Sequence, residues 1–329
     1  MLYFRFGMNI QSERGEMKKT QLKGVVMLML TAIIWGTAFV AQSVGMESVE
    51  AFTFSGIRTV LGGLVLLPFV LVRDRRAMAG MSDGERAAKR VRDKKALVYG
   101  AVLGLLFCAA GNLQQFAFYY STSGKIAFIT ALYMFFVPLF GLALKKRVSA
   151  VTWGCVVMGF VGLYFLCIGP DGLGGVNRGD VLTLICAAIY GVHILLVERF
   201  SPQVDGVRLS MMQFFVAGVI SCGLMFLFET PRLPDILSAA VPILYAGVLS
   251  CGLAYTLQIL GQKYTEATVA SLIMCCESVF GALAGALLLH ERLTGREILG
   301  CAIMFAAIVI TQVADLLTEK LKRRRSAAA

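Results

Sequence analysis

Residues 24–44 read GVVMLMLTAIIWGTAFVAQSV and contain no charged side chain. An α-helix of about 20 apolar residues is long enough to span a hydrocarbon core roughly 30 Å thick. Nine further apolar runs follow, and a soluble protein of 329 residues cannot bury ten helices of that length. The sequence therefore predicts an all-α integral membrane protein of about ten transmembrane helices, at 24–44, 50–72, 97–118, 122–144, 149–168, 180–199, 208–228, 238–260, 266–289 and 295–317.

The composition agrees with a membrane protein. Hydrophobic residues make up 58% of the chain and charged residues only 16%, against about 25% charged residues in an ordinary soluble domain. The nine cysteines all lie in apolar runs, and no CxxC motif or Cys/His cluster is present. We therefore expect no metal site, no cofactor and no disulfide framework.

The net charge of +11 is a topology signal rather than a sign of nucleic-acid binding. With the N-terminus inside and ten alternating helices, 25 of the 31 Lys and Arg residues fall on the inner side. Basic residues collect on cytoplasmic loops of membrane proteins. We expect a multi-pass protein of the cytoplasmic membrane with both termini in the cytoplasm and with no nucleic acid as partner.

The segments outside the helices are mostly short. We expect a polar, disordered cytoplasmic tail at 1–23, a charged cytoplasmic linker at 73–95, a second linker at 169–179 and a basic cytoplasmic tail at 318–329. The first apolar run is too long for a cleaved signal peptide and is expected to remain as the first helix, with Met17 as an alternative start. No extramembrane catalytic domain is expected.

The chain repeats itself at a shift of 144 residues. Ala110-Gly-Asn-Leu-Gln114 corresponds to Ala254-Tyr-Thr-Leu-Gln258, and Tyr120 corresponds to Tyr264. The repeat divides the chain into five-helix halves at 24–168 and 180–317. Because five is odd, the second half enters the membrane from the opposite side. Inverted repeats are typical of transporters, in which similar halves expose one site to each side in turn.

Several motifs resemble the EamA-type transporters of the drug/metabolite transporter superfamily. They are Ile33-Ile-Trp-Gly-Thr-Ala-Phe-Val40, Thr122-Ser-Gly-Lys-Ile-Ala-Phe-Ile-Thr-Ala-Leu-Tyr133, Gly261-Gln-Lys-Tyr-Thr265 and His290-Glu-Arg-Leu-Thr294. The resemblance covers about residues 24–317. It implies two inverted EamA repeats around a central cavity, and export or exchange of small metabolites, often amino acids, without ATP. The long 73–95 linker, Tyr190 in place of a second Trp, and Cys275-Cys276 depart from the pattern.

Two charged residues are the first candidates for substrate binding or coupling. A charge inside the membrane usually faces the bundle interior and has a partner or a function. Lys125 begins a helix and is expected to bind a substrate carboxylate, or else to act as a surface anchor. Glu277 lies midway along its helix and is expected to carry a proton or to bind an amino group, with an interhelical hydrogen bond as the alternative. Tyr133 matches Glu277 in the repeat register.

Arg58 and His193 have more conventional interpretations. Arg58 lies in the outer third of its helix, and a structural ion pair with Glu50 is the expected role. His193 titrates near physiological pH, which allows proton coupling, but a hydrogen bond within the bundle is the commoner role of a lone histidine. Proton coupling and a homodimer both remain open.

Polar residues at helical spacing indicate the cavity walls. Asn112, Gln115 and Tyr119 share one helix face, and Tyr255, Gln258 and Gln262 share another. We expect these faces to line a water-accessible cavity, with interhelical hydrogen bonding as the alternative. Trp35 is expected either to cap this cavity or to pack within the bundle.

Together with the EamA resemblance, the sequence predicts a secondary transporter of a small metabolite, an amino acid or a related compound, that works by alternating access. The resemblance implies that it is an exporter. An intramembrane enzyme is the first alternative, but HExxH, GxSxG and paired membrane aspartates are absent. A channel or a membrane scaffold is the second, but no charged rings or filter sequence are visible. The partners expected are the small-molecule substrate and the lipid bilayer.

Overall fold

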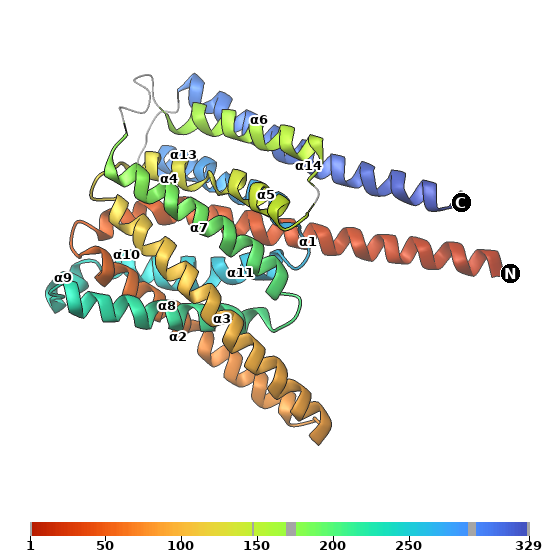
Figure 1. The fold of residues 1–329 in the computed structure, drawn as a ribbon, viewed down its shortest axis with the longest axis horizontal. Coiled ribbons are helices and arrows are strands. Elements are labelled where there is room, and N and C mark those ends of the chain that lie inside the picture. Colours follow the sequence, from red (N-terminus) through yellow and green to blue (C-terminus); the bar gives the residue numbers. More distant parts are fainter. Residues whose placement is uncertain (1, 147, 169–175, 289–293, 328–329) are drawn as a thin grey trace.

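The computed structural model describes residues 2–146, 148–168, 176–288 and 294–327, and this part of the chain is helical without strands (Figure 1). The first half contains α1 (Leu2–Gly45), α2 (Ala51–Met78), α3 (Asp83–Ala117), α4 (Ser123–Thr130), α5 (Tyr133–Ala143) and α6 (Ala150–Cys167). The second half contains α7 (Arg178–Phe200), α8 (Gly206–Phe228), α9 (Leu233–Ser238), α10 (Ala240–Leu244), the π-helical stretch η1 (Tyr245–Ala254), α11 (Tyr255–Gly261), α12 (Ala267–Met274), α13 (Cys276–Leu288) and α14 (Gly295–Ala327).

Eight helical spans between residues 21 and 261 are long and apolar enough to cross a membrane. The two remaining segments expected to cross are α12 with α13, which form a shorter apolar segment, and α14, which packs along α6. The predicted fold class, an all-α integral membrane protein with two repeats, is therefore confirmed.

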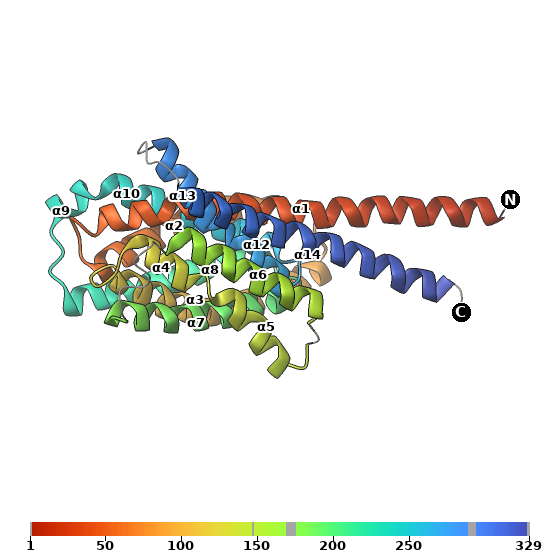
Figure 2. The same ribbon diagram turned by 90° about the horizontal axis from the view of Figure 1, so that it is seen from above.

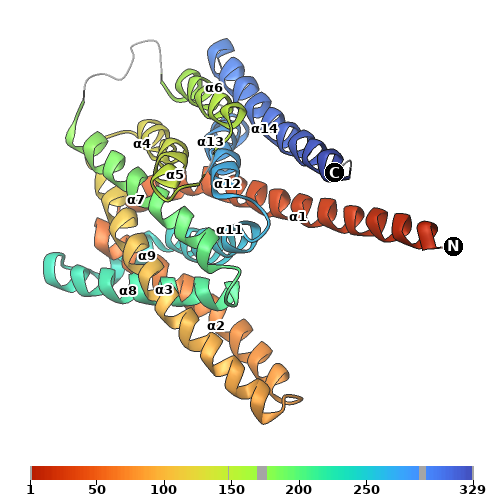
Figure 3. The same cartoon turned by 45° about the vertical axis from the view of Figure 1, so that its right-hand side comes forward.

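The two halves pack on each other reciprocally. The first helix of the first half, α1, packs on α12 and α13, the broken fourth helix of the second half. In the same way α7, the first helix of the second half, packs on α4 and α5. The second helices, α2 and α8, pack together, and so do the fifth helices, α6 and α14 (Figure 3). Each helix of one half thus packs against the same numbered helix of the other half as its repeat counterpart does, as expected for two related halves of inverted topology.

The linker expected at 73–95 is a helical hairpin. Helix α2 continues to Met78, and α3 already begins at Asp83, where Ser82 and Glu85 form a capping box. Ion pairs hold the hairpin to α8: Arg208 contacts Asp74 and Asp93, and Lys89 also contacts both carboxylates. Asp74, Lys89 and Asp93 of the expected linker therefore form a charge network with Arg208, and the linker continues α2 and α3 as helices.

The expected tails are also helical where they are described. Helix α1 begins at Leu2 instead of at 24, because no proline interrupts the polar segment 2–23. Helix α14 continues through the basic C-terminal segment to Ala327. Of the second linker, residues 169–175 lie outside the described residues. Both termini extend from the same end of the bundle, opposite α9 (Figure 2).

Candidate functional site

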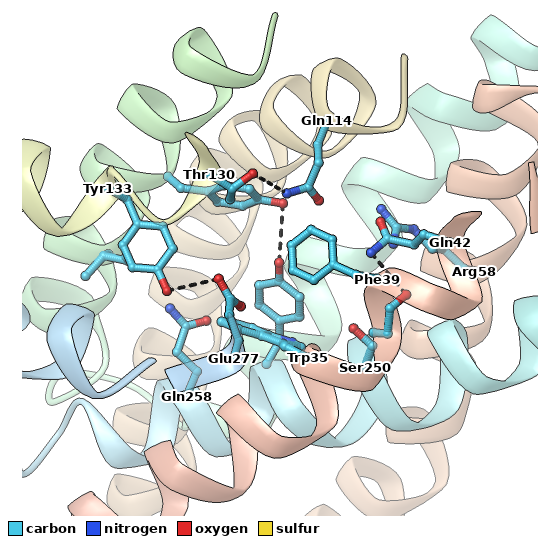
Figure 4. A pocket seen from close by; sticks show the side chains of 14 residues that line it. Trp35, Phe39, Gln42, Arg58, Gln114, Thr130, Tyr133, Ser250, Gln258 and Glu277 are labelled. Carbon is cyan, nitrogen blue, oxygen red and sulfur yellow. Dashed lines mark hydrogen bonds between the residues drawn. The ribbon is translucent and has the colours of Figure 1, made fainter. Parts of the chain in front are cut away.

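A cavity lies where the two halves meet, and it encloses about 530 Å³ of space not filled by atoms, including space open to solvent. Fourteen residues line this cavity, from α1, α2, α3, α4, α5, α7, η1, α11 and α13 (Figure 4). Both halves therefore contribute to one space at the centre of the bundle.

The cavity lies beside two helix breaks that correspond in the repeat. Helix α4 covers 123–130 and α12 covers 267–274, so that first and last residues are both shifted by 144. Each helix stops there, and α5 and α13 continue after a short interruption. The two breaks touch, because the Cys275 thiol donates to the carbonyl oxygen of Ala131 at 3.4 Å. Broken helices at the midplane are where transporters of inverted topology bind substrate.

Glu277 and Tyr133 follow these breaks and lie against each other. The Tyr133 hydroxyl donates to Oε1 of Glu277 at 3.3 Å, and both side chains are buried (Figure 4). The two positions are equivalent in the repeat, so the inverted symmetry itself brings them together. The Glu277 carboxyl is thereby held at the cavity wall with one hydrogen-bond donor from the other half.

Aromatic side chains form much of the remaining wall. The Trp35 and Tyr255 rings are 4.4 Å apart between centroids, and the Tyr255 hydroxyl donates to that of Tyr190 at 3.3 Å. Phe39 also lines the cavity. Aromatic faces bind apolar groups and also attract cations, so this wall is suited to an organic solute.

Arg58 forms the second charged position of the cavity. Its side chain is only 4% exposed, and Nη1 donates to Oε1 of Gln42 at 2.8 Å. Its Nε has no hydrogen-bond acceptor. The ion pair with Glu50 expected from the sequence does not form: the exposed Glu50 is the N-cap residue of α2, and Arg58 points toward the bundle interior instead.

Five of the sequence candidates line the cavity together: Trp35, Tyr133, Tyr255, Gln258 and Glu277. The structure thus brings together residues from four separate helices of the two halves.

The other four candidates, Lys125, Asn112, Gln115 and His193, are not among the cavity-lining residues, and neither are Tyr119 and Gln262 of the two expected polar faces. The Lys125 ammonium pairs with Asp180 at 2.7 Å. Asn112 donates to Ser221 at 2.9 Å, and His193 shares a hydrogen bond of 3.0 Å with Gln213. Gln115 is fully buried, and neither of its amide atoms has a partner.

Sequence reasoning missed Gln114, whose Nε2 donates to the hydroxyl of Thr130 at 3.0 Å. Both residues line the cavity. The signal was present, because the shift of 144 relates Gln114 to Gln258, which lines the same cavity. Helical spacing alone favoured the neighbouring Gln115. Gln42, Phe39 and Ser250 also line the cavity and gave no comparable sequence signal.

A family model described as the EamA-like transporter family matches residues 22–168 and again 177–313. The chain belongs to this family. The two matches coincide with the two helical halves, so the EamA repeats are the structural repeats.

Relatives of this EamA chain are named as transporters. An "Uncharacterized transporter" of Archaeoglobus fulgidus is 26% identical over 87% of this chain and 84% of its own length. The "Uncharacterized transporter YoaV" of Bacillus subtilis is 20% identical over 87% and 96%. The "Uncharacterized inner membrane transporter YedA" of Escherichia coli K12 is 25% identical over 57% of each chain.

A solved crystal structure shares the fold of this EamA protein. It superposes with a TM-score of 0.71 at 18% identity, over 91% of this chain and 98% of its own. Together with the family match, these similarities identify the chain as a multi-pass membrane transporter of the EamA type.

Proposed function

We propose that this EamA protein is a secondary transporter that moves a small metabolite, an amino acid or a related compound, out of the cytoplasm by alternating access. The observation that carries the proposal is the position of the cavity. It lies beside the paired breaks of α4–α5 and α12–α13, and both repeats line it. A site shared by two related halves can face either side of the membrane when one half rocks against the other.

The polar groups of the cavity support binding of a solute rather than passage of a continuous water column. Glu277 and Arg58 supply the two charges, and the amides of Gln114 and Gln258 lie between the repeats. Such a mixture of a few placed polar groups and aromatic walls is typical of small-molecule sites. Glu277 also gives the transporter a group that can exchange a proton, which makes protons the proposed coupling ion.

Expression in a host, followed by mass spectrometry of the external medium, tests the proposal. With the wild-type protein, we expect one class of metabolite to accumulate outside the cells. The Glu277→Gln variant should lose this accumulation at matched membrane levels. Glu47→Gln is the control, because the exposed Glu47 carboxylate lies outside the cavity.

The compound found in this way would then be loaded into proteoliposomes, and its efflux measured with and without a proton gradient. If no metabolite changes across a broad panel although the wild-type protein is folded in the membrane, export is refuted. If efflux is the same with and without the proton gradient, proton coupling is refuted, but transport itself is not.

A further inference from the structure

Arg58 is a buried charge that pairs with no carboxylate in the described part of the chain, and its guanidinium lies 5.4 Å from the centroid of the Phe54 ring. None of the ion pairs in the described part of the chain includes Arg58. Its acceptor, Gln42 Oε1, is neutral, and its Nε is unsatisfied. A guanidinium in a membrane-spanning helix is costly unless an anion or a polar partner compensates it. The cavity that Arg58 lines is where such an anion can reach it.

Glu277 is a buried acidic residue on the other side of the cavity from Arg58 (Figure 4). Figure 4 shows Glu277 and Tyr133 at one side and Arg58 and Gln42 at the other, with Phe39 and Trp35 between them. None of the ion pairs among the described residues joins Arg58 to Glu277, so neither charge neutralises the other by contact. A single ligand that contacts both must therefore carry its own charges at separate ends.

We propose that the substrate is an elongated zwitterion, with a carboxylate bound by Arg58 and Gln42 and an amine bound by Glu277 and Tyr133. This inference rests on the proposed transport function and specifies the substrate class of the same cavity. The guanidinium is a planar group with a fixed fork of donors that matches a carboxylate. The carboxylate of Glu277 accepts the hydrogen bonds of an ammonium group.

The wall between the two charged ends fits an apolar chain. Trp35 and Phe39 lie between the two ends (Figure 4), and the Tyr255 ring packs against Trp35. Methylene groups against aromatic rings gain from the removal of apolar surface from water. An ω-amino acid, or an amino acid with a second amine at the end of its side chain, has this arrangement. An α-amino acid without a side-chain amine has both charges at one end and so does not present them to opposite sides of the cavity.

Binding to purified full-length protein in detergent, measured by calorimetry, tests the inference with four probes. 6-Aminohexanoate carries both charged ends, hexanoate lacks the amine, hexylamine lacks the carboxylate, and glycine lacks the chain. We expect wild-type protein to bind 6-aminohexanoate at least about tenfold more tightly than each of the other three, which corresponds to about 1.4 kcal/mol.

The variants assign the two ends separately. Arg58→Gln should remove the advantage of 6-aminohexanoate over hexylamine and keep its advantage over hexanoate. Glu277→Gln should do the reverse. Arg58→Lys retains the charge and should keep part of the first advantage, which separates charge recognition from a folding defect. Arg232→Gln, at an exposed arginine outside the cavity, should match the wild type.

Three results overturn the inference. They are equal binding of all four probes, no binding of 6-aminohexanoate by wild-type protein, or selectivity unchanged in both Arg58→Gln and Glu277→Gln. Each leaves the proposed function in place if the export experiment detects a transported metabolite. If that experiment detects none, transport fails as well, so the two failures are distinguishable.

Discussion

At the scale of single residues, two neighbouring glutamines differ in whether their side chains line the cavity. Gln114 and Gln115 are adjacent, yet one faces Thr130 in the cavity and the other is buried without a partner for either amide atom. Successive residues of an α-helix are rotated by about 100° from each other. One position along α3 therefore separates a group that a solute can contact from one enclosed by other helices.

Replacing each glutamine by leucine should give opposite effects. Gln114→Leu should reduce transport of the exported metabolite at least about tenfold, because it removes an amide from the cavity wall and leaves Thr130 unpaired. Gln115→Leu should preserve transport and leave stability unchanged or raise it by about 1 kcal/mol, since an unsatisfied buried polar group costs about 1–3 kcal/mol. Efflux from proteoliposomes and thermal unfolding in detergent measure the two effects. If Gln115→Leu loses transport and Gln114→Leu does not, then Gln115, and not Gln114, contacts the solute.

At the scale of helices, the position of Glu277 depends on the close approach of α1 to α13. A Cβ atom at Gly36 would lie 2.4 Å from the carbonyl oxygen of Glu277 and 2.6 Å from the nitrogen of Gly281. Both neighbours are backbone atoms, which cannot move without moving the helix. Small residues at helix crossings permit this kind of contact in membranes.

Gly36→Ala should therefore force α13 away from α1 and displace the Glu277 carboxyl. Overpacking of this kind costs about 1–3 kcal/mol, and we expect transport to fall with it. Gly154→Ala in α6 is the matched control, because a Cβ there has no neighbour within 4 Å. Thermal unfolding and efflux of the two variants are compared. Equal stability of both would show that the α1–α13 contact is looser than the structure indicates.

The N-terminus of α2, the helix that carries Arg58, is held by a residue of the second half. Glu229 accepts hydrogen bonds of 2.7 Å from the backbone nitrogens of Phe52 and Thr53 and from the Thr53 hydroxyl. An acidic side chain at this end satisfies the free N–H groups and interacts favourably with the helix dipole. The N-cap residue itself, Glu50, makes no side-chain capping bond.

Glu229→Ala should lower the free energy of unfolding by about 1–3 kcal/mol, because it leaves these donors unpaired. Glu50→Ala should change it by less than about 0.5 kcal/mol, as expected for an exposed side chain without such contacts. Chemical unfolding in mixed micelles provides the comparison. A larger loss in Glu50→Ala than in Glu229→Ala would restore the role that the sequence suggested for Glu50.

At the scale of the whole molecule, the basic hairpin and the two termini lie toward one end (Figures 1 and 2). Both termini and the α2–α3 hairpin extend away from the end where α9 lies (Figures 1 and 2). The basic residues of the 73–95 segment belong to this hairpin. Since basic segments remain in the cytoplasm, this end is expected to be cytoplasmic.

Cysteine labelling of intact cells checks the orientation. In a background with the nine cysteines replaced, Arg232→Cys before α9 should react with an impermeant maleimide, while Gly80→Cys in the hairpin should react only after permeabilisation. Both positions are exposed, so accessibility through the membrane alone decides the result. The opposite pattern would reverse the predicted topology.

The sequence by itself determined the membrane class, the ten crossings, the two repeats and the family resemblance. These depend on apolar runs, on local motifs and on a constant shift, all of which are properties of the chain order. It also indicated Glu277, as a carboxylate midway along a membrane helix, and Tyr133, as its counterpart in the repeat.

The tertiary structure decided which polar groups meet. It placed Arg58 beside Gln42 instead of Glu50, paired Lys125 with Asp180, chose Gln114 over Gln115, and joined the charges of the 73–95 segment to Arg208 on α8. Each of these depends on how a helix is rotated about its axis and on which distant helix faces it. Helical periodicity in the sequence fixes neither the rotation of a helix nor the helix that it faces. Both are determined only when helices from the two repeats pack closely together.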